Sequence, residues 1–335
     1  MKVSLLNTLA YMAALVTAAP SGCDFSLVGF GKDNPIGATT GGKGGRIVTV
    51  TTPEALASAV EGNEPRTVYA KGTFNLTSRL RVGSNKSIIG VGKGAEVRQN
   101  GVTIANSTNV ILRNFGIRFI VDNDGITVQN STRVWIDHNE FESEFSQEVG
   151  PDYYDGQCDI VRGSDWITVS WNYFHNHWKS SLIGNSDVLR DVDFGKLHIT
   201  YHHNYWRNIG TRGPAGRFGH QHIYNNLYVD FHYQAIHSRS DNQVLVEGNV
   251  FKGDTRTALT TYGLVIPEDS PNTSPEGDPE IDGFANLGAK NDFGNSDVNI
   301  TQKGTFYKAP YRYKLTPLDR VESIVKQGVG LGNLG

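Results

Sequence analysis

The sequence predicts an all-β fold in which the chain winds into a parallel β solenoid. Short alternating apolar stretches recur between Gly, Asn and Asp residues, which is the pattern of short strands joined by tight turns. In successive stretches an Asn is followed two residues later by an aromatic residue. These Asn residues are Asn139, Asn172, Asn204, Asn226 and Asn249.

The spacing of the recurring Asn residues fits the coils of such a solenoid. The steps are 33, 32, 22 and 23 residues, and a weaker copy at Asn114 precedes Asn139 by 25 residues. A step of 22–25 residues accommodates three short strands and their turns. Equivalent residues of stacked coils lie about 4.8 Å apart, so we expect a hydrogen-bonded Asn ladder and an aromatic stack. A β-sandwich would not require this recurrence.

The two ends of the solenoid need covers. Thr52 and Pro53, followed by apolar residues up to Val60, predict an N-capped helix that closes the N-terminal end. Residues 318–326 predict a second helix, either a lid or a segment lying along the side. The Pro-, Gly-, Asp- and Asn-rich segment 267–295 predicts a long irregular excursion.

The two long steps indicate insertions within 142–166 and 175–197. The first is acidic and contains Asp155 and Asp159, while Asp137 lies in the stretch just before it. The second contains Lys179, and Arg212 and Arg217 follow in the next coil. Carboxylates that converge from neighbouring coils repel one another unless a cation neutralises them, and their oxygens favour Ca²⁺. Solvated acids on a loop would give the same spacing, so spacing alone is a weak calcium signal.

The N-terminal residues have the pattern of a secretory signal peptide. Lys2 precedes an apolar run over 3–16, and the small residues up to Ala19 end the run before Pro20. We expect a signal peptide over 1–19 and a single domain over 20–335, secreted and extracellular. The run is too short to span a membrane, which needs about 20 apolar residues. Six sequons fit this route: Asn75, Asn85, Asn106, Asn130, Asn272 and Asn299.

Charge and cysteine content limit the partners. With 31 basic and 34 acidic residues the net charge is -3, so we expect no nucleic acid partner. The two cysteines, Cys23 and Cys158, would either form one disulfide outside the cell or leave Cys158 as a buried thiol. Nothing in the sequence requires more than a monomer.

Five stretches resemble the pectate lyases of polysaccharide lyase family 1. They are DGITV at 124–128, VWIDHNEF at 134–141, DGQCDIVRGSDWITVSWNYFHNHWKSSLIGNSD at 155–187, ITYHHNYWRN at 199–208 and RGPAGRFGHQHIYNN at 212–226. They follow the family's order over the central third of the chain. The resemblance implies a right-handed, single-stranded parallel β-helix with an N-terminal capping helix and long side loops.

The resemblance also implies site residues. Asp137, Asp155 and Asp159 fall where the family binds Ca²⁺, and Lys179 falls where it contacts a substrate carboxylate. The partner would be polygalacturonate, cut by β-elimination into 4,5-unsaturated oligogalacturonides during plant cell wall degradation.

The segment RGPAGR supplies the remaining assignments. Arg212 falls at the family's catalytic base and Arg217 at a substrate-binding Arg. Ala215 stands where the family's motif has a further Arg, which puts one secondary contact in doubt. Elimination removes the C5 proton next to the C6 carboxylate, and cations must stabilise the resulting charge. Because an Arg is normally protonated, we expect Ca²⁺, Lys179 and Arg217 to lower the pKa of Arg212, and activity to rise at alkaline pH.

Three other functions compete with this one. A pectin lyase would act on methyl-esterified polymer, but retained calcium carboxylates favour the acidic substrate. A polygalacturonase-type hydrolase would need clustered acids for inverting hydrolysis. An inactive polysaccharide-binding solenoid is the alternative outside enzymes, and the acidic residues together with Lys179, Arg212 and Arg217 disfavour it.

Overall fold

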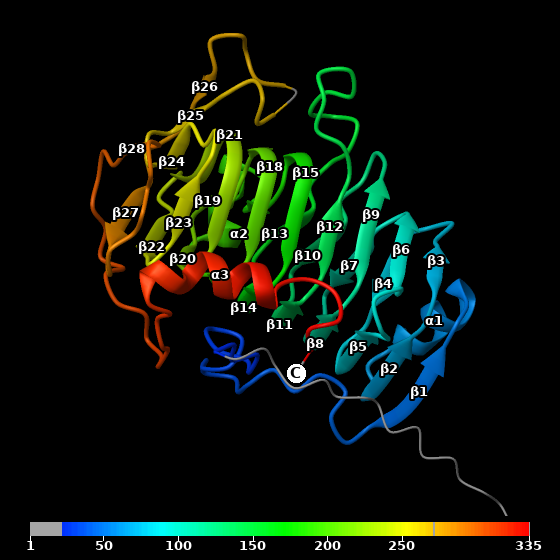
Figure 1. The fold of residues 1–335 in the computed structure, drawn as a ribbon. Helices are drawn as coiled ribbons and strands as arrows, with labels where there is room; N and C mark the ends of the chain where they lie inside the picture. The colour runs from blue at the N-terminus through cyan, green and yellow to red at the C-terminus, as the bar shows by residue number, and fades with distance from the viewer. Residues whose placement is uncertain (1–21, 271, 335) are drawn as a thin grey trace, which may run out of the picture.

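The computed structural model describes residues 22–270 and 272–334, which wind into a stack of parallel coils (Figure 1). One sheet has ten strands, in spatial order β1 (Arg46–Val50), β2 (Arg66–Ala70), β5 (Lys86–Gly90), β8 (Thr108–Arg113), β11 (Thr132–Asp137), β14 (Asp165–Ser170), β17 (His198–His202), β20 (His220–Tyr224), β22 (Gln243–Glu247) and β27 (Phe284–Leu287). All of its neighbouring strands are parallel.

The second sheet has sixteen strands and forms the two other faces, which meet at the long bent strand β21 (Leu227–Arg239). One face contains β3 (Thr73–Asn75), β6 (Glu96–Gln99), β9 (Gly116–Ile120), β12 (Glu140–Glu142), β15 (Tyr173–Lys179) and β18 (Tyr205–Thr211), and β23 (Val250–Lys252), β24 (Thr257–Thr260) and β28 (Asp297–Asn299) extend it beyond β21. The other face contains β4 (Leu80–Val82), β7 (Val102–Ala105), β10 (Ile126–Gln129), β13 (Cys158–Val161), β16 (Leu182–Ile183) and β19 (Ala215–Arg217). The predicted parallel β-helix is therefore confirmed.

The recurring Asn residues form the predicted ladder inside the stack. Asn139 Nδ2 donates to Asn172 Oδ1 at 3.0 Å. The same contact continues through Asn204, Asn226, Asn249 and Asn291. The residue directly before a ladder Asn has a positive φ at His138, Trp171, His203, Asn225 and Gly248. This left-handed residue makes the corner at which the chain leaves the ten-stranded sheet.

The aromatic residue of each repeat stacks on its neighbours in the next coils. The ring of Phe174 lies 4.6 Å from that of Phe141 and 4.1 Å from that of Trp206. Tyr228 and Phe251 continue the stack at 5.9 and 4.4 Å. All five side chains are buried, so the stack is part of the hydrophobic core.

Helices cover the N-terminal end and one side. Helix α1 (Pro53–Val60) begins after Thr52, whose hydroxyl accepts from the Ala55 N–H at 3.2 Å. It buries Leu56 and Val60 against the end of the core, as predicted. Helix α3 (Leu318–Gly328) lies along the side of the stack, where it packs on β21 and β23 (Figure 1).

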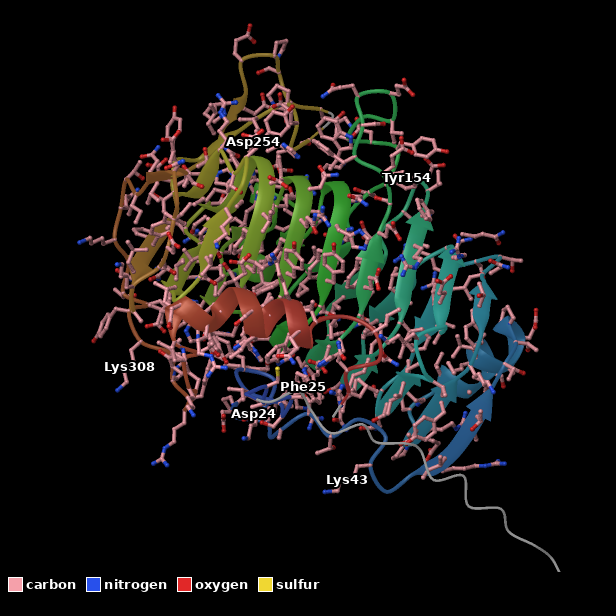
Figure 2. All side chains as sticks on the ribbon, in the orientation of Figure 1. Asp24, Phe25, Lys43, Tyr154, Asp254 and Lys308 are labelled. Carbon is pink, nitrogen blue, oxygen red and sulfur yellow. The ribbon has the colours of Figure 1, made fainter. Side chains whose placement is uncertain are left out.

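Three excursions leave the stack, at residues 143–157, 184–197 and 261–283. The second contains the short helices η1 (Asp187–Leu189) and α2 (Arg190–Asp193), and the third contains the hairpin of β25 (Leu264–Val265) and β26 (Asp278–Pro279). The first excursion, which contains Tyr154, and the third project from the same edge of the molecule (Figures 1 and 2). The prediction of irregular chain over 267–295 is wrong for β27, because β27 pairs in register with β22.

The two cysteines are not paired. Cys158 is fully buried on β13, whereas Cys23 packs near Ile324 of α3. The predicted signal peptide over 1–19 lies outside the described residues. Within those residues, no helix combines the length and apolar character that crossing a membrane requires.

Candidate active site

A cavity of about 450 Å³ opens on the outer face of β10, β13 and β16. The excursion over 143–157 contributes to its lining, and Ser270 of the excursion over 261–283 reaches it as well. Its charged lining residues are Asp124, Asp152, Asp155, Asp159, Arg162, Lys179 and Arg212. Four of the six residues predicted to form the site therefore meet in one cavity.

Strand alternation places Asp159 in this cavity. Cys158 and Ile160 of β13 are buried in the core, so Asp159 between them points outward. Its Oδ1 accepts from the Leu182 N–H at 2.9 Å. Burial raises the pKa of Asp159 well above its ordinary value, and the charge of Asp124 adds to this effect.

Asp124 belongs to the preceding coil and was not among the predicted site residues. Its Oδ2 accepts from the Thr127 hydroxyl at 2.5 Å, and its Oδ1 accepts from the Gly156 N–H at 3.1 Å. Burial raises the pKa of Asp124, and the negative charge of Asp155 raises it further. The carboxylates of Asp124 and Asp159 disfavour each other's ionised form, and together with Asp155 they offer only oxygen donors, which fits the requirements of a bound Ca²⁺.

The structure does not bring Asp137 to this group. Asp137 ends β11 in the ten-stranded sheet, is fully buried and does not line the cavity. Its Oδ2 lies 2.6 Å from Arg113 Nε and 2.6 Å from His138 Nδ1, and its Oδ1 accepts from the Ser170 hydroxyl at 2.5 Å. The prediction that Asp137 converges with Asp155 is corrected, since its charge is already compensated in the interior. Asp124 takes that place.

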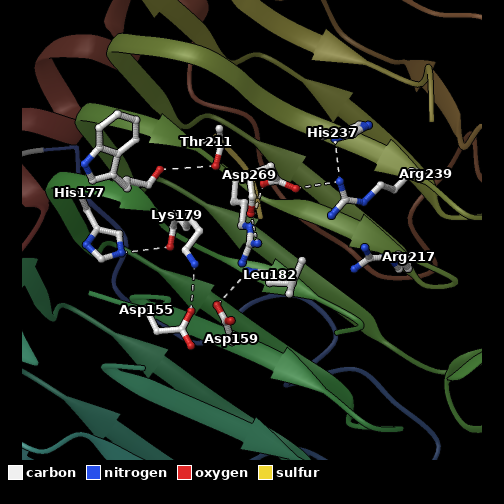
Figure 3. A network of polar contacts seen from close by, with 12 residues as sticks. Asp155, Asp159, His177, Lys179, Leu182, Thr211, Arg217, His237, Arg239 and Asp269 are labelled. Atoms are coloured by element: carbon white, nitrogen blue, oxygen red, sulfur yellow. Dashed lines mark hydrogen bonds and ion pairs between the residues drawn. The ribbon is translucent and has the colours of Figure 1, made fainter. Parts of the chain in front are cut away.

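Lys179 lies at the end of β15, beside the acidic excursion. Its Nζ lies 3.2 Å from Asp152 Oδ1 and 3.5 Å from Asp155 Oδ1 (Figure 3). The side chain is almost buried, whereas both acids are half exposed. Behind it, His177 Nε2 lies 3.1 Å from the Lys179 carbonyl oxygen, and burial lowers the pKa of His177 to about 4. His177 is therefore neutral near pH 7, and its Nε2–H donates to this carbonyl.

Arg212 lies at the corner between β18 and β19, where its φ is +67°. Its Nε donates to Asp269 Oδ1 at 2.8 Å, and its Nη2 donates to the Asp269 carbonyl. Burial opposes the charged form of Arg212, but the carboxylates of Asp269 and Asp159 outweigh burial and raise its pKa. The predicted lowering of this pKa is therefore absent, because sequence analysis did not include Asp269.

Arg217 is held outside the cavity lining. Its Nε lies 2.9 Å from Glu280 Oε2, and its Nη1 donates to the Gly184 carbonyl at 2.8 Å. Arg162, which follows β13, lines the cavity and makes no side-chain hydrogen bond or ion pair with the described residues. Arg162 is thus a cavity cation without an ion-pair partner among the described residues, whereas Arg217 is paired with Glu280.

The tightest group of potential metal ligands in the described residues lies away from the cavity. Glu140, Glu142 and His175 place ligand atoms within 4.8 Å of one another. Arg118 forms ion pairs with both glutamates, and Glu140 also lies 3.2 Å from His175. The Arg118 guanidinium already occupies the oxygens of both glutamates, so the acids of the cavity remain the better candidates for a cation.

Comparison with known proteins identifies relatives of this chain. A family model described as pectate lyase matches residues 1–333. The chain is 37% identical to a pectate trisaccharide-lyase of Bacillus licheniformis, over 98% of this chain and 94% of that protein. It is 40% identical to pectate lyase A of Aspergillus niger, over 88% of this chain and 85% of that protein.

A solved structure shows the same fold. The crystal structure of a pectate lyase from Bacillus sp. N165 in complex with trigalacturonate superposes with a TM-score of 0.77 at 32% identity, covering 92% of this chain and all of that one. The sequence matches, the parallel β-helix and the charged cavity on its side point to one conclusion. The chain belongs to the pectate lyase family.

Proposed function

We propose that this protein is a secreted, monomeric, calcium-dependent pectate lyase that cleaves (1→4)-α-D-galacturonan by β-elimination. The observation that supports this most directly is the cavity in which Asp124, Asp155 and Asp159 lie beside Lys179 and Arg212. Each galacturonate unit has one carboxylate, so the substrate needs cations where it binds. It also needs a group that removes the C5 proton.

The acids would hold the metal and Lys179 would bind substrate. Asp124, Asp155 and Asp159 are the residues we assign to Ca²⁺, which when bound supplies positive charge that stabilises the enolate formed at C5 and C6. Lys179 contributes further positive charge from within the cavity wall. Lys179 pairs with the half-exposed acids Asp152 and Asp155, and such exposed ion pairs are weak. A substrate carboxylate can therefore take the place of these acids beside Lys179.

Arg212 is the proton acceptor that we propose. It is a buried cation whose charge interacts with the carboxylates of Asp159 and Asp155, and it lines the same cavity. Since neighbouring carboxylates raise its pKa, only a small fraction is deprotonated near pH 7, and this fraction grows with pH. Activity should therefore increase well into the alkaline range. A profile that peaks near pH 5 would indicate a carboxylate base instead.

The test is the absorbance of the new C4=C5 double bond during incubation with polygalacturonate. We expect product in the presence of Ca²⁺, loss of product with chelator, and recovery when Ca²⁺ is restored. Faster turnover of highly methyl-esterified pectin, unaffected by chelator, would support the pectin lyase alternative. Reducing ends without the absorbance would indicate a hydrolase, and binding without cleavage would indicate an inactive solenoid.

A further inference from the structure

Asp269 connects the excursion over 261–283 to the proposed base. Its side chain is 1% exposed and contacts Arg212 through both a carboxylate oxygen and its own backbone carbonyl. No other carboxylate of the described residues forms an ion pair with Arg212. One residue from outside the stacked coils thus fixes two nitrogens of the guanidinium.

The third nitrogen of Arg212 is left for the cavity. A guanidinium has five N–H donors on three nitrogens. Nε and Nη2 donate to Asp269, whereas Nη1 makes no hydrogen bond with the described residues. Because Arg212 lines the cavity, Nη1 is the nitrogen that a substrate can reach.

The Asp269 carboxylate is itself held in place. Its Oδ2 accepts from Arg239 Nη1 at 2.8 Å, while its Oδ1 accepts from Arg212 (Figure 3). Arg239 ends β21, one coil beyond Arg217, with which it is in register. Burial alone would raise the pKa of Asp269, but Arg212 and Arg239 lower it well below the ordinary value, so the group is ionised at any working pH. Arg239 at the end of β21 and Arg212 at the corner between β18 and β19 therefore fix where this carboxylate lies.

We propose that Asp269 is a positioning residue that orients Arg212 so that Nη1 accepts the C5 proton of the bound uronate. The proposal rests on the proposed function. In the step, Nη1 takes the proton, the electron pair of the C5–H bond forms the C4=C5 double bond, and the C4–O bond breaks. The leaving oxygen takes a proton from water. The Asp269 carboxylate raises the pKa of Arg212 and so lowers the fraction of Arg212 that is deprotonated, so the benefit of Asp269 lies in orientation.

The experiment compares Asp269→Asn and Asp269→Ala with the wild type and with Glu268→Gln. Glu268 is the neighbouring acid on the same excursion, makes no ion pair or side-chain hydrogen bond with the described residues, and does not line the cavity. kcat and KM are measured on polygalacturonate with saturating Ca²⁺, and urea unfolding shows whether each variant is folded. Asp269→Asn preserves side-chain volume and provides a folded variant if Asp269→Ala does not fold.

We expect kcat of Asp269→Asn to fall roughly tenfold to a hundredfold, because small misplacement of a reacting group has this effect. KM should change less than twofold, as should both constants of Glu268→Gln. Wild-type kcat in folded Asp269→Asn would overturn the inference while leaving the proposed function intact. A rise in KM as large as the fall in kcat would also overturn the inference, since it would indicate that Asp269 contacts substrate. A wild type without unsaturated product would overturn the proposed function, and this inference with it.

Discussion

Replacing Asp137 and Asp124 by Asn separates a folding role from a metal-binding role. In Asp137→Asn, the buried cation Arg113 loses its only anionic partner among the described residues. Breaking a buried ion pair costs about 3–5 kcal/mol. The Arg113 side chain is 16% exposed and lies 4.5 Å from the Trp135 ring, so part of the loss is relieved. We expect the free energy of unfolding to fall by about 3 kcal/mol.

Asp124→Asn should behave in the opposite way. It removes one charge from a group of carboxylates whose raised pKa values report mutual repulsion and burial. Without metal, stability should stay the same or increase by up to about 1 kcal/mol. The calcium concentration needed to reach a given stabilisation should rise roughly tenfold or more, because ligand charge sets calcium affinity.

Urea unfolding with chelator and across a calcium titration measures both effects, since a ligand that binds the native state stabilises it by an amount that grows with the logarithm of ligand concentration above Kd. In Asp137→Asn, Ca²⁺ should raise the free energy of unfolding by the same amount as in the wild type, starting from a lower value in chelator. Our reasoning fails if Asp137→Asn unfolds like the wild type in chelator but no longer responds to Ca²⁺. It also fails if Asp124→Asn reaches the same stabilisation as the wild type at the same calcium concentration.

Three further predictions concern substrate binding, pH and the scaffold. Arg162→Ala should raise KM about two- to fivefold with little change in kcat, because an exposed ion pair with substrate contributes little binding energy. The control is Lys196→Ala, which removes an exposed cation that does not line the cavity, and equal KM values for the two variants would contradict the prediction. Because the pKa of Asp159 is raised, the chelated protein should lose stability as pH rises from about 4 through that pKa, and Ca²⁺ should reverse the loss; urea midpoints across pH test the sign. Asn204→Ala removes four buried side-chain hydrogen bonds and should cost about 4 kcal/mol in urea unfolding, against under about 0.5 for the exposed Asn130→Ala.

The repeat made the fold predictable, because each coil contains its own local signal. Asn172 and Phe174 repeat the arrangement of Asn139 and Phe141, and the structure stacks both pairs. What sequence spacing could not supply was the exact corner at which an insertion leaves the stack. Lys179 was predicted inside the second insertion, yet it belongs to the regular strand β15.

The site was predictable where a motif lies on the cavity face and not where it lies on another face. Asp137 ends the short strand β11 and Asp159 lies within the short strand β13, but the sequence spacing does not tell which sheet each strand joins. Two signals could have corrected this. Arg113 precedes Asp137 by one coil, and an Asp-Gly pair occurs at both Asp124 and Asp155, again one coil apart. Asp269 had no such signal, because it lies in an irregular excursion 57 residues after Arg212.

The distribution of charge supports the proposal that a metal, and not another side chain, completes this site. The cations on one side of the cavity are compensated from within the chain, since Asp269 pairs with Arg212 and Arg239. The acids on the other side are not, because Lys179 reaches Asp155 but neither Asp124 nor Asp159. Adding a basic side chain there would occupy the space that substrate needs, whereas a bound cation keeps free positions for substrate oxygens. The calcium dependence that we propose follows from two carboxylates, Asp124 and Asp159, that form no ion pair with the described residues and that a rigid scaffold holds together.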